Sequence, residues 1–283
     1  MTFKKILIIL FLIAPLTPAQ KFEYVSSIGN FEEASSFYIS PSGFVYVTDI
    51  ETDEVIALDT LGNVIRNIGG YGWSPSAFDS PVDIYADALK IFVVDKNNHR
   101  IQRFDKNLNF IFAIFTRNND NEEERFGYPL SAVMSNQGDV FILDSENSRI
   151  IKFDIFGNFI QNFGGYDYGN YALENPNQLA VSMLNNIYVV DKNKILIFDQ
   201  YGNSLGRAEG TEKFEGIRIL FNWLTVNTTE KIFIANLKLP ELNLSKVILE
   251  GYEDSIGIVS SLVFNDKLYV LTKKNILIFN RTH

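Results

Sequence analysis

The chain has 283 residues, of which 34 are acidic and 25 are basic, and its formal net charge is -9. It contains no cysteine and only two histidines, which excludes disulfides, thiolate catalysis and Cys-ligated zinc and leaves little for a His-rich metal site. A hydrophobic share of 46% against 21% charged residues excludes a disordered tail. The 24 Phe and 13 Tyr favour strands over helices, so the composition indicates a globular, β-rich protein.

Residues 1–19 have the pattern of a signal peptide. Two lysines precede an unbroken apolar run over residues 6–14, which is too short to span a bilayer and is followed by prolines. We expect cleavage after Ala19 and export of residues 20–283 as a secreted or periplasmic protein, with an uncleaved anchor as the alternative. No later stretch is apolar enough over 18 residues to span a membrane, so we expect no membrane insertion after cleavage.

A short apolar segment that ends in a polar residue recurs along the chain. Val45–Asp49 is the first copy, and three further copies end at Asp95, Asp144 and Asp191, at spacings of 46 to 49 residues. Weaker copies end at Asn236 and Thr272. Most copies are followed by a second apolar run, and Gly-Asn turns precede a third run in several of them. Four short strands per unit, separated by turn signals, predict an antiparallel meander.

Repeats of this length with four strands are typical of β-propeller blades. The six copies predict an all-β fold: a six-bladed β-propeller of four-stranded antiparallel blades over residues 20–283. The last unit ends one strand short, and residues 22–28 have the pattern of an outer strand, so we expect the N-terminal strand to pair in the last blade and close the ring. The turn chemistry is lost over residues 214–249, where we expect a distorted blade.

Two of the units resemble NHL repeats, which are named after an Asn-His-Leu run. Residues 93–105 contain Asn98-His99-Arg100-Ile101, in which Arg and Ile replace Leu, and residues 143–154 are similar. The stretches over residues 69–81 and 164–176 also resemble the Gly-rich loop between such repeats. The resemblance implies the NHL-repeat propeller fold and leaves the activity open, because many functions occur on one fold.

The resemblance also brings two kinds of enzyme into consideration. Amidating lyases and streptogramin lyases of similar shape rely on histidine, whereas here His99 lies at a hairpin position that the repeat explains and His283 is the last residue. Calcium-dependent lactonases and gluconolactonases use oxygen ligands near the axis, and no spacing here singles out such a set. A divalent-cation-dependent propeller enzyme of lactonase or lyase type, with calcium in the central channel, therefore remains the alternative. Otherwise we expect no catalytic residue, metal or cofactor.

The recurring aspartates are candidates for a structural role. Asp49, Asp95, Asp144 and Asp191 each stand once per repeat at the end of a strand. A carboxylate at such a position can accept hydrogen bonds from backbone N–H groups of the next turn. We therefore expect these residues to fix turns.

The loops between the repeats are the predicted binding site. Tyr71 and Trp73 stand in one loop, and Tyr166, Tyr168 and Tyr171 in another, where aromatic rings can hold a peptide or a sugar. The alternative is that these rings cap the groove between blades. We expect a monomeric binding or scaffold protein that recognises a protein, peptide or glycan through these loops without catalysis. The acidic charge counts against a nucleic-acid partner.

Overall fold

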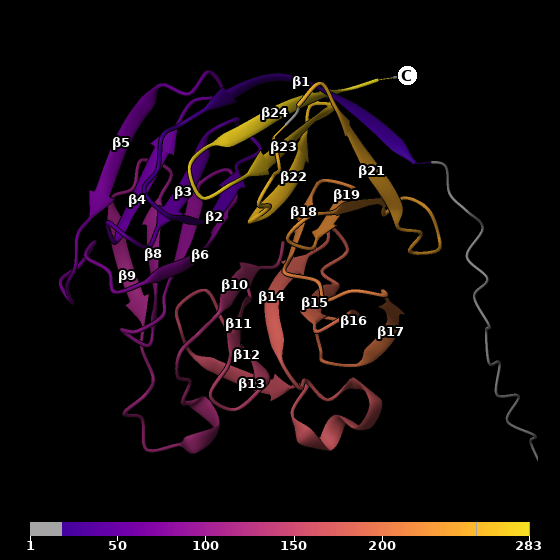
Figure 1. Ribbon diagram of the computed structural model, residues 1–283. Helices are drawn as coiled ribbons and strands as arrows, with labels where there is room; N and C mark the ends of the chain where they lie inside the picture. The colour runs from indigo at the N-terminus through magenta and orange to yellow at the C-terminus, as the bar shows by residue number, and fades with distance from the viewer. Residues whose placement is uncertain (1–18, 253, 283) are drawn as a thin grey trace, which may run out of the picture.

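The computed structural model of the chain describes residues 19–252 and 254–282, which form an all-β propeller (Figure 1). Within these residues, no helix is long and apolar enough to cross a membrane. Of the predicted signal peptide, residues 1–18 lie outside the described residues, and so does His283.

Four sheets are separate antiparallel meanders whose strands follow one another in chain order. The first comprises β2 (Ala34–Ile39), β3 (Val45–Asp49), β4 (Glu54–Leu58) and β5 (Val64–Gly69). The second comprises β6 (Pro81–Ala86), β7 (Lys90–Asp95), β8 (Arg100–Asp105) and β9 (Phe110–Ile114). The third comprises β10 (Ser131–Met134), β11 (Val140–Asp144), β12 (Arg149–Phe153) and β13 (Phe159–Phe163). The fourth comprises β14 (Pro176–Val181), β15 (Ile187–Asp191), β16 (Lys194–Phe198) and β17 (Ser204–Glu209).

The remaining strands form one continuous eight-stranded sheet, in the spatial order β18-β19-β20-β21-β1-β24-β23-β22. Its first half consists of β18 (Gly216–Leu220), β19 (Trp223–Asn227), β20 (Ile232–Asn236) and β21 (Ser245–Glu250). Its second half consists of β1 (Gln20–Ile28), β24 (Ile276–Arg281), β23 (Lys267–Leu271) and β22 (Ser260–Phe264). Two short 3-10 helices, η1 (Glu122–Glu124) and η2 (Tyr166–Tyr171), lie in loops.

The expectation of six separate blades is therefore wrong. Within the described residues there are four separate four-stranded blades, and the other eight strands belong to a single sheet. The physical reason is β1, which uses both of its edges. It pairs antiparallel with β24, with Tyr24 opposite Phe279, and it also pairs parallel with β21, with Gln20 opposite Val247. A repeat spacing cannot predict this parallel pairing, because it joins β1 to the last strand of another meander, β21, which the repeat places in a separate blade.

One weak copy of the repeat lies at a different position from the strong copies. The strong copies are the second strands β3, β7, β11 and β15, whereas the copy that ends at Asn236 is β20, the third strand of its meander. The second strand is β19, which ends at Asn227 and pairs with β18. The distortion lies at β21, which shares only two residue pairs with β20 before it runs beside β1.

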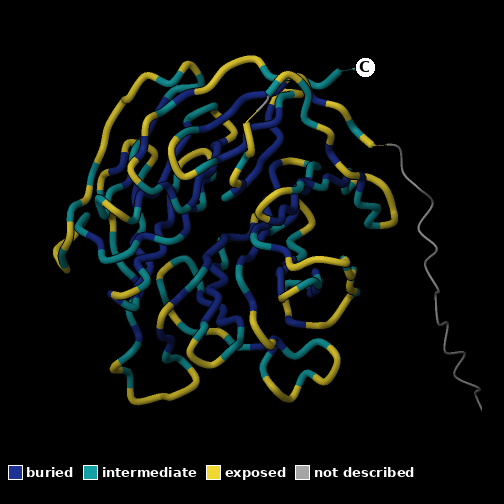
Figure 2. The backbone as a smooth tube through the Cα atoms, in the orientation of Figure 1, coloured by how far each residue is buried: buried dark blue, intermediate teal, exposed yellow. Residues whose placement is uncertain are grey.

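The first strands of the meanders surround the centre of the molecule. Each contacts the next in a closed ring, in the order β2, β6, β10, β14, β18 and β22, and β22 contacts β2. Figure 2 shows these strands as largely buried and the connecting loops as exposed. Apolar cores fill the space between neighbouring sheets; Phe37 of β2, Val93 of β7 and Phe104 of β8, for example, belong to one such core.

The turns after the third strands repeat one device. Asp59 accepts hydrogen bonds from the N–H groups of Leu61 and Asn63 and from the Asn63 side chain, while Gly62 adopts a φ of 91°. The hydrogen bond from the Asn63 side chain is the main cause that lowers the pKa of Asp59. The same arrangement joins Asp105 to Asn109, Asp154 to Asn158 and Asp199 to Asn203. This device explains the Gly-Asn signals of the sequence.

Candidate functional site

The recurring aspartates hold the loops that enter each meander. Asp95 accepts hydrogen bonds from the N–H of Asp79 (2.8 Å), the side chain of Asn98 (3.0 Å) and Nε of Arg100 (2.7 Å). Asp144 repeats this set with Gly127, Asn147 and Arg149. The backbone N–H group thus comes from the preceding loop rather than from the next turn, whereas the two side chains come from the hairpin that follows the aspartate. We call the Asp, Asn and Arg of each set the loop clamp.

Asp49 and Asp191 hold their entry loops through backbone groups. Asp49 accepts hydrogen bonds from the N–H groups of Glu32 and Glu33, and also from Glu51 in the next turn. Asp191 accepts them from the two consecutive N–H groups of residues 174 and 175. These contacts give the four aspartates a structural role.

The entry loops lie at one end of the ring. Because successive strands of a meander run in opposite directions, the loops before the first strands share an end with the hairpins after the second strands. The turns after the first and third strands lie at the opposite end. We call the first of these the loop end; it carries residues 70–80, 115–130 and 164–175.

Trp73 is held in place at the loop end although 53% of its surface is exposed. The guanidinium of Arg100 lies 4.8 Å from the centre of the indole ring, and Arg100 also donates a hydrogen bond to the carbonyl of Trp73. Phe115 packs edge-on against the indole, with ring centres 5.3 Å apart. Since Arg100 belongs to the loop clamp of Asp95, the second meander fixes Trp73 directly. Tyr71, in the same loop, is 80% exposed.

The other three predicted rings divide into two kinds. Tyr166, at the start of η2, is 97% exposed. Tyr168 and Tyr171 instead pack edge-on against Phe198, with ring centres 6.3 and 6.1 Å away, and contact the core of the fourth meander. Tyr71, Trp73 and Tyr166 are therefore the exposed rings of the predicted set, whereas Tyr168 and Tyr171 cap the groove between sheets.

The loop end contains a further group of side chains that the sequence did not predict as part of a site. Tyr128 is 43% exposed, and its ring meets that of His99 edge-on at 4.2 Å. The guanidinium of Arg117 lies 5.6 Å from the Tyr128 ring centre and pairs with Glu146 at 2.8 Å. The available signal was an aromatic residue, Tyr128, in a loop that leads to a proline, as in the stretches over residues 69–81 and 164–176. With Trp73 and Phe115, these residues extend the aromatic surface across the second and third meanders.

His99 takes part in this group as a hydrogen-bond acceptor. Its Nδ1 accepts the N–H of Tyr128 at 3.0 Å, which requires the neutral ring at that nitrogen. Burial lowers the pKa of His99, and the positive charge of Arg117 lowers it further, while Glu146 opposes the shift. The histidine is thus engaged in joining two loops.

The centre of the ring is filled by hydrogen-bonded polar side chains. Asp83 of β6 pairs with Arg218 of β18 at 2.6 Å, and both side chains are only 1% exposed. Asp83 also accepts hydrogen bonds from Ser36 of β2, Gln178 of β14 and Ser131 of β10. Because β6 and β18 are not neighbours in the ring, these side chains meet across its centre. We call these five residues the axial cluster.

The axial cluster bears on the cation-dependent alternative. Both carboxylate oxygens of Asp83 already accept hydrogen bonds, and a guanidinium occupies the position next to them. Calcium would need six or more oxygen ligands and would be repelled by Arg218. Among the described residues, no group of three or more His, Cys, Asp or Glu is placed to hold a metal ion.

Two stretches of the chain match the model of a known repeat family. The NHL repeat family matches residues 78–104 and 126–153, which contain the loop clamps of Asp95 and Asp144. The chain carries NHL repeats. Over 142 residues the chain is 32% identical to the protein named brain tumor from Drosophila melanogaster. That alignment covers 48% of this chain and 13% of the relative, so the NHL-bearing chain spans a small part of that protein.

Solved structures support the fold of the NHL-bearing chain. A streptogramin B lyase superimposes with a TM-score of 0.62 at 13% identity, over 92% of this chain and 98% of the lyase. A virginiamycin B lyase from Staphylococcus aureus gives a TM-score of 0.60 at 12% identity, over 90% of this chain and 98% of the lyase. At such identities the likeness shows the fold alone.

Proposed function

We propose that this chain is an exported, monomeric binding propeller that recognises a polypeptide partner through the rings of its loop end. The observation that carries the proposal is Trp73, which is half exposed yet fixed by Arg100 and Phe115. An aromatic side chain that is already ordered loses little conformational entropy on binding, and such residues contribute most of the affinity in many interfaces.

The surroundings of these rings suit a polypeptide. Arg117 and Glu146 form an ion pair beside Tyr128, and the acidic helix η1 lies in the same entry loop. Charges at the rim of an aromatic surface select partners by complementarity. The acidic net charge of the chain opposes binding to nucleic acid. The axial cluster, with Asp83 already paired to Arg218, favours binding over cation-dependent catalysis.

Selection of ligands from a displayed peptide library, with a glycan array in parallel, tests the proposal on residues 20–283. Trp73→Ala and Tyr166→Ala should each weaken the selected peptides tenfold or more, as measured by calorimetry. Phe156→Ala is the matched control, because Phe156 is 80% exposed in a turn at the opposite end of the ring. Equal affinity in Trp73→Ala and wild type, or an equal loss in Phe156→Ala, would contradict the proposal, and so would selection of glycans alone.

Export is tested separately. When the full chain is expressed in a secreting bacterial host, the exported protein should begin at Gln20 on N-terminal sequencing. Retention of residues 1–19 on a membrane-bound product would show the uncleaved anchor instead.

A further inference from the structure

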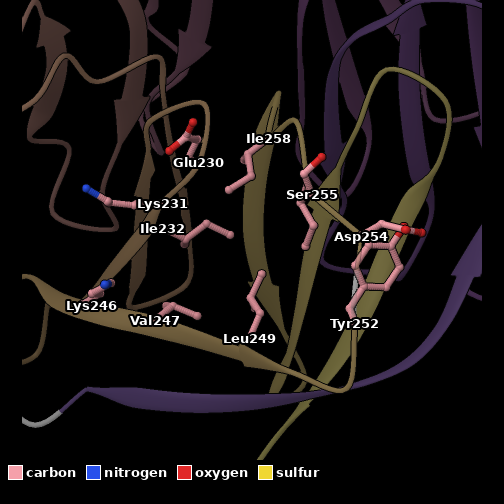
Figure 3. A pocket seen from close by; sticks show the side chains of 11 residues that line it. Glu230, Lys231, Ile232, Lys246, Val247, Leu249, Tyr252, Asp254, Ser255 and Ile258 are labelled. Atoms are coloured by element: carbon pink, nitrogen blue, oxygen red, sulfur yellow. The ribbon is translucent and has the colours of Figure 1, made fainter.

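A cavity of about 470 Å³ lies where the eight-stranded sheet opens between β20 and β21 (Figure 3). It forms because β21 leaves β20 after two residue pairs and follows β1 instead. The chain that leads towards β22 forms a further wall. We call this space the seam cavity. Its volume falls within the roughly 300–1,000 Å³ of small-molecule sites in proteins.

The floor of the seam cavity is apolar and ordered. Ile232 of β20, Val247 of β21 and Ile258 are buried members of one core, and Leu249 packs against them. Tyr252 forms a side wall, and its ring is held by Tyr24 of β1 at a centre-to-centre distance of 5.1 Å. A ligand must therefore present an apolar body to this floor, because a polar group there would lose its hydration without gaining a partner.

The two ends of the seam cavity carry charged side chains. Figure 3 shows Lys231, Lys246 and Glu230 towards one end and Asp254 with Ser255 at the other. Lys231 already pairs with Glu212. Within the part of the chain that the structure describes, no ion pair or side-chain hydrogen bond engages Lys246 or Asp254, and both residues are exposed. The cavity thus offers the free ammonium group of Lys246 at one end of an apolar floor and the free carboxylate of Asp254 at the other, with the exposed carboxylate of Glu230 beside Lys231.

We propose that the seam cavity binds a short apolar peptide with free ends. The peptide carboxylate meets Lys246, its amino group meets Asp254, and its aliphatic side chains lie on Val247 and Ile258. An anionic lipid-like ligand would use Lys246 alone, would place its tail against the carboxylate of Asp254, and would be repelled by the net charge of -9. A zwitterion carries no net charge and satisfies both ends.

Isothermal titration calorimetry of residues 20–283 with Leu-Leu-Leu tests the proposal. The free tripeptide should bind saturably at one site, and N-acetylation or C-terminal amidation should each weaken it tenfold or more, since each removes one charged contact. Lys246→Met should weaken the free tripeptide equally but leave the affinity of the amidated peptide unchanged. Asp254→Asn should likewise weaken the free tripeptide but leave the affinity of the acetylated peptide unchanged. This pairing of variant and peptide assigns each end of the ligand.

Three further variants keep the test specific. Lys106→Met removes an exposed lysine from a turn at the opposite end of the ring and should leave the affinity unchanged. Ser255→Trp should fill the cavity and abolish binding, with circular dichroism reporting that the fold is intact. Trp73→Ala should bind the tripeptide normally, because the seam cavity is separate from the aromatic loops. Absence of saturable binding, indifference to both caps, or tighter binding of decanoate than of the tripeptide would overturn the proposal.

Discussion

The second and third meanders and the eight-stranded sheet hold their strands in different ways. In the two meanders, Asp95 and Asp144 end the second strand, and each binds an arginine of the next strand and the backbone of the entry loop. In the eight-stranded sheet, the second strand β19 ends at Asn227, and the second strand β23 is followed by Thr272. Asn227 donates to the neighbouring carbonyl of Thr228, and Thr272 bonds its own turn. The charged clamp is therefore specific to the NHL-bearing part.

The two regions also differ in strand pairing. A clamp that ties the entry loop to the second and third strands holds each NHL meander together from within. The eight-stranded sheet lacks this clamp, and in it β1 bridges β24 and β21. The same bridging draws β21 away from β20 and opens the seam cavity. The cavity is thus a consequence of the pairing of β1 with β21.

The strongest test concerns the axial cluster, which connects the two regions across the ring. Arg218→Met leaves the carboxylate of Asp83 buried without its cation, which should lower the free energy of unfolding by about 3–5 kcal/mol. Urea denaturation measures this loss. Lys21→Ala is the control, because it removes an exposed pair with Glu250 and should cost less than about 1 kcal/mol. A loss below about 1 kcal/mol in Arg218→Met would show that the axis does not couple the regions.

The second test compares the clamp with its neutral counterpart. Asp95→Ala removes a buried carboxylate and leaves the Arg100 guanidinium and the N–H of Asp79 without their acceptor, so we expect a loss of about 2–4 kcal/mol. Asn227→Ala removes neutral hydrogen bonds and should cost about 1 kcal/mol. Both values come from the same urea denaturation experiment. If the two losses were equal, the clamp would not distinguish the two regions.

The sequence predicted those parts of the fold that depend on local chemistry. The recurring Asp and the Gly-Asn turns are local signals, and the segment Val45–Asp49 found by the repeat is the strand β3. The parallel pairing of β1 with β21 is a contact between distant segments and leaves no periodic trace. The run before Asn236 resembled a second strand because β20 has the same short apolar pattern as the second strands.

The candidate site was predictable only in part, for a similar reason. The loop aromatics were visible in the sequence, but exposure separates Tyr166 from Tyr168, and it depends on how η2 folds onto Phe198. The axial cluster contributes different residue types from each first strand, such as Asp83 and Arg218, so no repeat marks it. The seam cavity depends on the departure of β21, which only the tertiary structure shows.

The smallest expected effect is a pH dependence confined to the NHL-bearing part. The pKa of His99 is lowered in the folded protein by burial and by Arg117, so the unfolded chain binds a proton more readily. The stabilising contribution is complete above the unfolded pKa of about 6.5 and is lost as the pH falls through the lowered folded value. Its size should stay below about 1 kcal/mol because solvent screens the partly exposed ring.

His99→Asn is the variant that isolates this effect. Asparagine tolerates the φ of 49° at this position, so the hairpin should keep its shape while the titrating group is removed. Urea denaturation at pH 7.5 and pH 5.5 should show a loss of stability in the wild type that is reduced in the variant. Hydrogen exchange should place the loss in the loop around Tyr128, whose N–H is donated to His99, and not in β21. An equal loss in both proteins would mean that groups other than His99 control stability in this pH range. His283, the other histidine, is present in both proteins.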